Sequence, residues 1–345
     1  MSERSGLLAS VAETIKDYRE GELPQPTPDH VDRWVCQFED SVQVPILREV
    51  DHVLKRTYFT QENVDGFFAN QIKSRRIAGD KPCDFWQAAH LLDIQKNGNS
   101  QSEILSHFIS LLRDQCDPNI SVVGQHGGSF VYIDDVIFSG SRIRTDLASW
   151  IKEHATKYAT LHIIVIASHN SGLYYTKRYL NNISNECEKH IDIHIWTGRN
   201  IENGNNRRNV SEVLWPAEIP DDARSYVEGE TDYPFQPRQP IKGRRHSIFS
   251  SEEGRQLLER ELLLAGLRIR SFCKNPKSIM RPLGFSLFGL GFGSTIVTYR
   301  NCPNNAPLAL WWGDPDASPY HPFSKWYPLV PRKTYNKEGD FEDYV

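Results

Sequence analysis

The sequence predicts an α/β fold in which a parallel-sheet core follows a helical N-terminal region and precedes an irregular, aromatic C-terminal region. Short β-rich runs recur at Phe130–Ile133, Leu161–Ala167 and Ile191–Trp196, about thirty residues apart. Apolar residues at helical spacing fill residues 143–155 and 174–183 between these runs. This alternation of strand and helix is typical of a parallel sheet with crossover helices.

Composition narrows the class of protein. The chain has 345 residues, of which 39% are hydrophobic and 24% charged, as in folded proteins of two or three domains. The net charge of −4 argues against a protein that binds nucleic acid through its overall charge. Six cysteines without metal-ligand spacing predict reduced thiols in a cytoplasmic protein. The N-terminus lacks the long apolar run of a signal peptide.

The first eighty residues predict a series of helices. Thr27 followed by Pro28 is typical of an N-cap and the first helical position. Another helix is expected to begin at Pro45. A further one is expected to carry Val64 and to end at Gly79.

These patterns predict four regions. Residues 1–80 form the helical N-terminal region, and residues 81–200 form the α/β core, which includes a helix at Glu103–Leu112. The proline-rich residues 201–243 are expected to be a linker or excursion. Residues 244–345 are expected to carry a basic helix and an aromatic C-terminal hood that completes the core.

One uncharged segment reaches the lower length limit of a transmembrane helix. It runs from residue 282 to residue 299 and contains four glycines together with serine and threonine. These residues make it too weakly apolar and too poor in helix formers to insert. The sequence therefore predicts no membrane association, and a packed strand or loop at this segment.

The strongest functional signal lies between Phe130 and Leu147. An apolar strand leads to the adjacent acids Asp134 and Asp135, and a short loop of Ser139, Gly140 and Ser141 precedes a helix. A loop glycine lets the backbone approach an anion, and the start of a helix attracts phosphate. Two carboxylates can accept hydrogen bonds from a vicinal diol. The pattern predicts a site for a ribose 5-phosphate, although an acidic strand end before an ordinary helix cap is the alternative.

This run resembles the ribose-phosphate motif of type I phosphoribosyltransferases. The resemblance implies a phosphoribosyltransferase-like core in which Asp134 and Asp135 hold the ribose hydroxyls of phosphoribosyl pyrophosphate. It also implies that the loop of Ser139, Gly140 and Ser141 holds the 5-phosphate, and that Mg²⁺ reaches the acids indirectly through the ribose. The sequence departs from the family at Phe138 and at Arg142, where the family usually has Thr or Ser; Arg142 can offer a charged contact instead.

A second loop matches the position of the family's pyrophosphate loop. It is polar, leads into the helix at Glu103, and offers four candidate ligand-binding residues: Lys96, Gly98, Ser100 and Ser102. The alternative is an ordinary N-capping turn.

More of the chain is similar to the phosphoribosyltransferase-like effectors of bacterial conflict and anti-phage operons. The likeness rests on Trp34 with Gln37-Phe38, on the residue 98–102 loop, on the paired acids, and on Asn301–Asn305 with Leu310-Trp311-Trp312. Some relatives accompany retron reverse transcriptases. The resemblance therefore implies a toxin effector whose partners are such a transcriptase with its RNA–DNA, or other defence-operon proteins.

Three further features have both a functional and a purely structural interpretation. His169 follows a strand and could bind a ligand, although a loop histidine is more often structural. Residues 242–281 hold ten Lys or Arg against four Glu, which suggests nucleic-acid contact or a solvated helix face. Trp311 and Trp312 are expected to fill a core or hood rather than to stack on a nucleobase.

Two functions of different kinds remain open from the sequence. In the first, the chain is an enzyme of glycosyl transfer that acts at the anomeric carbon of a phosphoribosyl donor or a nucleotide, with Mg²⁺. In the second, it keeps the nucleotide-sized pocket but serves as a catalytically inactive sensor or assembly subunit of a defence nucleoprotein complex.

Overall fold

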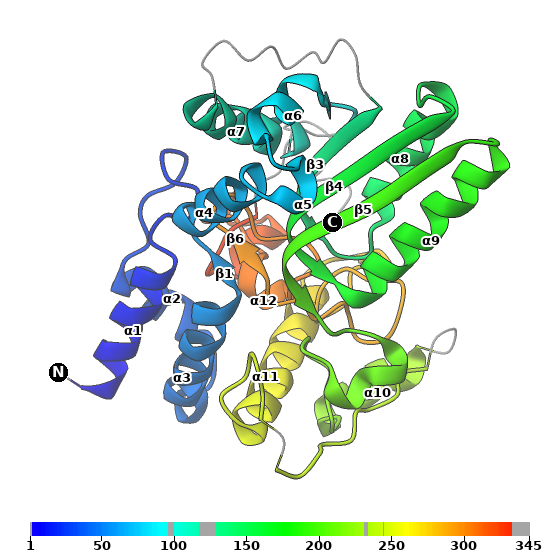
Figure 1. Ribbon diagram of the computed structural model, residues 1–345. Helices are drawn as coiled ribbons and strands as arrows, with labels where there is room; N and C mark the ends of the chain where they lie inside the picture. The colour runs from blue at the N-terminus through cyan, green and yellow to red at the C-terminus, as the bar shows by residue number, and fades with distance from the viewer. Residues whose placement is uncertain (1, 96–99, 117–127, 231–233, 244, 333–345) are drawn as a thin grey trace. The chain divides into compact units, whose positions relative to one another are not determined.

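The computed structural model describes residues 2–95, 100–116, 128–230, 234–243 and 245–332 (Figure 1). The chain divides into two compact units. Unit 1 combines residues 1–61 with residues 204–345, and unit 2 is the continuous stretch 62–203. The helical region expected over residues 1–80 is therefore shared between the units. Two residues of the predicted pyrophosphate loop, Lys96 and Gly98, lie outside the described residues.

Unit 2 contains the parallel sheet that the sequence predicts. Its strands are β2 (His90–Leu92), β3 (Ser129–Ile137), β4 (Tyr158–His169) and β5 (His190–Ile201), in the spatial order β2-β3-β4-β5. All three pairings are parallel. The three β-rich runs of the sequence are the centres of β3, β4 and β5, so the α/β class is confirmed.

Helices connect these strands. They are α7 (Ser100–Gln115), α8 (Ser141–Glu153) and α9 (Asn170–Glu186). Apolar residues of α8 and α9 form one core with the sheet residues that face them, among them Leu161 and Ile163. Because side chains alternate along a strand, residues between these point to the opposite face of the sheet.

The opposite face of the sheet is covered by helices that precede it in sequence. These are α4 (Gln61–Ile72), α5 (Arg75–Ala78) and α6 (Pro82–Ala88). Phe85 of α6 packs edge-on against His162 of β4, with ring centroids 5.8 Å apart. Gly79 ends α5 rather than the helix that carries Val64, because that helix already stops at Ile72.

The register of the sheet brings three strand ends together. Ile137 of β3 pairs with Ser168 of β4, and His169 of β4 pairs with Ile201 of β5. Parallel strands point their carboxyl ends to one edge, where ligands of such sheets usually bind. Any chemistry encoded after β3 and after β4 therefore shares this edge.

Unit 1 begins with α1 (Glu3–Thr14), α2 (Pro28–Val35) and α3 (Asp40–Thr57). Thr27 caps α2 as predicted, because its side chain accepts a hydrogen bond from the backbone N–H of His30. The prediction that a helix begins at Pro45 is wrong, since α3 starts five residues earlier and includes this proline. As the sixth residue of α3, Pro45 lies beyond the first turn, so its missing N–H removes one intrahelical hydrogen bond.

The rest of unit 1 combines short elements with irregular chain. Its longest helix is α11, and it also holds a two-stranded parallel sheet of β1 and β6. The bounds are β1 (Tyr58–Phe59), η1 (Asn205–Val210), α10 (Asp221–Gly229), α11 (Glu252–Ser271), β6 (Val297–Thr298), α12 (Leu308–Trp311) and η2 (Pro322–Lys325). Trp311 and Trp312 are buried, as the core interpretation predicts.

A buried ion-pair network ties the expected linker to α11. Glu259 of α11 pairs with Arg238 at 2.8 Å and with Arg255 at 2.7 Å, and all three side chains are almost fully buried. Arg238 also pairs with Glu252 at 2.7 Å. Residues 201–243 are thus not a plain linker: they include α10 and supply a buried cation to the core. Sequence patterns show charge but not which charges are buried together.

Some basic residues of 242–281 make hydrogen bonds and ion pairs inside unit 1. Arg255 donates to the backbone oxygens of Ser211 and Val213. Arg260 pairs with Glu261 at 2.6 Å. These contacts reduce the charge that this helix offers to a nucleic acid.

The uncharged segment 282–299 forms turns and a short strand. Gly284 and Gly291 adopt positive φ angles of 104° and 136°, which favour glycine. In the part of the chain that the structure describes, no helix has the length and apolarity needed to cross a membrane.

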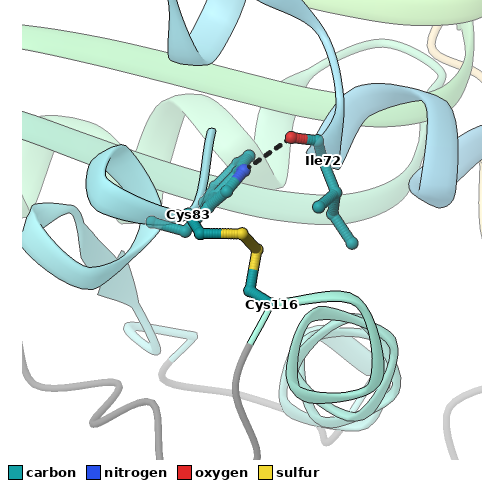
Figure 2. The surroundings of a disulfide bond; sticks show 4 residues. Ile72, Cys83 and Cys116 are labelled. Atoms are coloured by element: carbon teal, nitrogen blue, oxygen red, sulfur yellow. Dashed lines mark hydrogen bonds between the residues drawn. A yellow bond between two sulfur atoms is a disulfide. The ribbon is translucent and has the colours of Figure 1, made fainter. Parts of the chain in front are cut away.

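A disulfide joins Cys83 of α6 to Cys116 after the end of α7 (Figure 2). The two Cα atoms lie 5.4 Å apart although 33 residues separate the cysteines in sequence. Close by, the indole N–H of Trp86 donates to the carbonyl of Ile72. The expectation that every thiol is reduced is wrong for this pair, because the packing of α6 and α7 brings together cysteines that sequence spacing keeps apart.

Candidate functional site

The site predicted from the sequence lies where β3 passes into α8. Gly140 is the N-cap of α8 and has φ 71° and ψ 8°, a left-handed conformation that glycine adopts without strain. No side chain caps this helix with a hydrogen bond. The first N–H groups of a helix lack intrahelical partners, so the start of α8 can donate to an anion. We call Ser139–Ser141 the phosphate loop.

The phosphate loop packs tightly on the start of α9. A Cβ atom at Gly140 would lie 2.0 Å from Oγ1 of Thr176 and 3.1 Å from the carbonyl oxygen of Gly172. A Cβ at Gly172 would in turn lie 1.9 Å from the carbonyl oxygen of Phe138. Only glycine fits at either position, so the chain is built to bring the turn after β3 close to α9.

Asp134 is buried at the end of β3, with 5% of its surface exposed. Its Oδ1 accepts the backbone N–H of Asp135 at 2.9 Å, and its Oδ2 accepts the hydroxyl of Tyr132 at 3.3 Å. Burial raises the pKa of Asp134 above its ordinary range, and the charge of Asp135 raises this pKa further. Asp134 therefore favours the neutral form. Its hydrogen bonds connect it to Tyr132 and to the backbone of Asp135 within β3.

Asp135 is the more accessible of the two acids. Its side chain is half-buried, and its Oδ1 accepts the backbone N–H of Val136 at 2.8 Å. This hydrogen bond fixes one carboxylate oxygen. Asp135 can therefore contact a ribose hydroxyl or a ligand-bound cation more readily than the buried Asp134 can.

The residues around the phosphate loop are accessible. Ser139, Ser141 and Arg142 are exposed. The N–H of Ser141 donates to Oγ of Ser139 at 3.4 Å, and the charge of Arg142 lowers the pKa of Asp134 against the larger effect of burial. The loop thus combines two hydroxyls, a guanidinium and a helix start near one carboxylate.

His169, at the end of β4, lies under this edge and not on its surface. Its side chain is fully buried, its Nδ1 lies 3.1 Å from the carbonyl oxygen of Ile137, and its ring faces Phe138 at 5.2 Å. Burial lowers the pKa of His169 to about 4, so the ring is neutral at pH 7 and Nδ1 donates to that carbonyl. Phe138, where the related motif has a hydroxyl, packs on this histidine.

The predicted pyrophosphate loop is described only in part, since residues 96–99 lie outside the described chain. Ser102 donates to Oδ1 of Asp93 at 2.6 Å. Ser100 lies 3.4 Å from the side-chain oxygen of Gln95, which also accepts the backbone N–H of Gln101 at 3.0 Å. These contacts fix the start of α7 close to the carboxyl end of β2.

Three supporting residues escape the sequence reasoning. Tyr132 contacts Asp134 from two residues upstream on the same face of β3, a spacing that could have signalled it. Thr176 is fully buried against Gly140, and no spacing in the sequence relates the two. Gln101 is also fully buried and donates to the carbonyl of Leu92 at 2.7 Å, which ties α7 to β2.

A polar groove of about 760 Å³ lies at the other edge of the sheet. Ser129, Tyr158 and His190, the first residues of β3, β4 and β5, contribute to its lining. It lies at the amino ends of the strands, far along β3 from the paired acids. We do not assign the ribose-phosphate site to it.

Among the described residues, no three His, Cys, Asp or Glu side chains converge as a metal-binding cluster. A divalent cation at the phosphate loop would therefore take most of its oxygen ligands from a bound phosphate and from water, with Asp135 as the accessible carboxylate. Mg²⁺ commonly binds in this way, through one or two carboxylates and the substrate's phosphates.

The parallel sheet, the paired acids and the uncapped helix start form the arrangement that the resemblance to phosphoribosyltransferases implies. The family model PRTase-CE matches residues 31–332, and the chain belongs to this phosphoribosyltransferase-like effector family. Among curated proteins no significant match is found. None of the solved structures matches the chain either.

Proposed function

We propose that the chain binds phosphoribosyl pyrophosphate or a related nucleotide at the phosphate loop and acts at the anomeric carbon of the ribose. The observation that carries this proposal is Gly140, which holds a left-handed turn against Thr176 after the end of β3, the strand that carries the paired acids. Gly140 itself places no side chain over the helix start. A phosphate can then approach the backbone N–H groups of α8 closely.

Each side chain of the site has a role in this proposal. The N–H groups at the start of α8, with Ser139 and Ser141, hold the 5-phosphate, and Arg142 adds a cation. Asp135 accepts hydrogen bonds from the ribose hydroxyls, while Asp134 and Tyr132 hold the strand end in place. In this proposal the carboxylate of Asp135 also stabilises the positive charge that develops at the reacting sugar.

Mg²⁺ is part of the proposal. When bound, it neutralises the charge of a diphosphate leaving group. The half-buried carboxylate of Asp135 has a second oxygen beyond the one that accepts the N–H of Val136, which suits a hard cation or its water shell. Ser100 and Ser102, at the start of α7, are proposed to contact the diphosphate.

A second function is favoured by the state of Asp134. Both of its oxygens accept hydrogen bonds within the protein, and its burial favours the neutral form. Phe138 lacks the hydroxyl of the related motif and packs on His169. A site with one accessible acid suits a sensor or assembly subunit that binds the nucleotide without turnover.

The biological setting is proposed from the family resemblance. We propose an effector of an anti-phage defence system that works in the cytoplasm, alone or with a retron reverse transcriptase and its RNA–DNA.

Phosphorus NMR tests turnover directly. The protein is incubated with phosphoribosyl pyrophosphate and Mg²⁺, with water as the acceptor, and formation of pyrophosphate and ribose 5-phosphate is followed over time. The enzyme function predicts a new pyrophosphate signal that Asp135→Asn abolishes and that Glu186→Gln, an exposed acid at the end of α9, leaves unchanged. Binding of the ligand by the wild type without any new signal would exclude hydrolysis of the donor and favour the sensor function.

A further inference from the structure

An exposed row of tyrosines covers the first half of α9. Tyr174, Tyr175 and Tyr179 are 57%, 53% and 42% exposed. The rings of Tyr174 and Tyr175 meet edge to face with centroids 5.4 Å apart, and Arg178 donates to the Tyr174 hydroxyl at 3.4 Å. Large aromatic rings are costly to leave in water, so three on one helix face indicate a surface that is covered when the protein works.

Arginine side chains contact two of these tyrosines. The guanidinium of Arg144, in α8, lies 5.8 Å from the ring centroid of Tyr179. Arg142, Lys177 and Arg178 are exposed, and residues 139–145 and 170–182 contain no Asp or Glu. The chain as a whole carries −4, so this basic, aromatic surface contrasts with the rest of the protein.

The two helices that supply these side chains pack against each other. Figure 1 shows α8 and α9 running beside one another on the same side of the strands. Arg144, Tyr174, Tyr175, Arg178 and Tyr179 are joined by these contacts and form one surface, the tyrosine–arginine face. Thr176, which contacts Gly140, is buried beneath it, so this face adjoins the phosphate loop.

We propose that the tyrosine–arginine face binds a segment of single-stranded nucleic acid. Unpaired bases stack on exposed aromatic rings, and arginines between the rings neutralise the phosphates. A duplex would use the cations but not the rings, because its bases are already stacked. The inference goes beyond the proposed function, since the face lies outside the acids and the phosphate loop and does not depend on chemistry there.

Fluorescence anisotropy with a labelled 20-nucleotide single strand provides the test. Tyr174→Ala, Tyr175→Ala and Tyr179→Ala combined should weaken binding at least about tenfold, because each stacked base contributes measurably. Tyr158→Ala is the matched control, since Tyr158 is 67% exposed on β4 in the same unit, and it should bind as the wild type does. Circular dichroism melting verifies that the exposed substitutions leave the fold intact.

The arginines give a second, independent readout. Arg144→Gln with Arg178→Gln should lower the slope of log affinity against log salt concentration by about 1.4, since each phosphate contact on a single strand contributes about 0.7. A duplex of the same sequence should bind more weakly than the single strand. Asp135→Asn should bind the strand normally, which separates this proposal from the fate of the ribose-phosphate site.

Several outcomes would overturn the proposal. They are equal binding by the triple tyrosine variant and the wild type, preference for the duplex, and no binding of the single strand at 50 mM salt, a condition that favours phosphate contacts. A labelled polyglutamate peptide that binds as tightly as the strand would assign the face to an acidic protein instead.

Discussion

The two units of this protein are assembled by different kinds of contact. In unit 2, neighbouring strands pair across a single helix, as when Val131 pairs with His162 and His162 with His194. In unit 1, the two ends of the chain meet: the indole of Trp34 donates to the carbonyl of Ala309, and the hydroxyl of Tyr18 to that of Pro331. Periodic sequence patterns report the first kind of contact well and the second kind poorly.

The difference extends to how polar groups are used. Unit 1 buries a network of charges around Glu259, whereas unit 2 keeps its polar groups at the strand ends, where a ligand can reach some of them. The first arrangement stabilises one structure, and the second can perform chemistry. We therefore expect substitutions in the network to act on stability, and substitutions at the phosphate loop to act on binding.

The largest effect is expected at the buried network. Glu259→Gln leaves Arg238 and Arg255 buried without their shared carboxylate, which should cost about 3–5 kcal/mol of unfolding free energy. Hydrogen exchange should show faster opening in unit 1, and chemical denaturation gives the magnitude. Glu228→Gln, at an exposed position of α10, is the control. Equal stability of the two variants would mean that the network contributes nothing.

The disulfide of unit 2 should have the next largest effect. Cys83→Ser opens a crosslink between residues 33 apart in sequence, which should lower the unfolding free energy by about 3–4 kcal/mol in the chain-entropy account. A reductant should lower the melting temperature of the wild type and leave the variant unchanged. Cys36→Ser, at a free thiol, should keep the response to reductant. A wild type that melts identically with and without reductant would contradict the bond.

Substitution of Gly140 tests whether the turn after β3 requires glycine, in contrast to a glycine inside a helix. Gly140→Ala places an alanine in a left-handed conformation, with its Cβ 2.0 Å from Oγ1 of Thr176. Together these effects should lower the unfolding free energy by about 2–3 kcal/mol. Gly66→Ala is the matched control, because a Cβ there meets nothing within 4 Å and alanine favours the helix by up to about 1 kcal/mol. Thermal melting should move in opposite directions for the two. A shift in the same direction would show that the turn after β3 is not tightly packed.

His169 should make stability depend on pH. Its pKa is lowered to about 4 by burial, whereas an unfolded histidine titrates near 6.5. The unfolded chain binds this proton first, so the contribution of His169 to the unfolding free energy should fall as pH drops from about 6.5 to about 4, by up to about 1.4 kcal/mol per pH unit. His169→Asn should flatten this slope. His162, whose pKa burial lowers to about 4, and Asp134, whose pKa burial raises to about 8, remain in both proteins and contribute to the slope with opposite signs. Identical slopes would mean that His169 is not buried as a neutral ring.

Much of unit 2 could be predicted from the sequence because its information is local. The strand centres, the helices between them and the turn at Gly140 follow from periodicity and from residue type. Thr176 and the bond between Cys83 and Cys116 could not be predicted, since each depends on how helices pack in space. The burial of Asp134 also escaped the sequence, because two adjacent acids look equivalent until the strand's faces are known.

The proposal that Asp135 and the phosphate loop hold a ribose phosphate is tested most directly by isothermal titration with Mg²⁺ and phosphoribosyl pyrophosphate. The wild type should bind, and Asp135→Asn should weaken binding at least about tenfold, equivalent to about 1.4 kcal/mol. Asp134→Asn should weaken it less, because Asp134 is buried and favours the neutral form that asparagine imitates. Glu186→Gln should bind as the wild type does. Undiminished binding by Asp135→Asn, or no binding by the wild type, would contradict the assignment of this site.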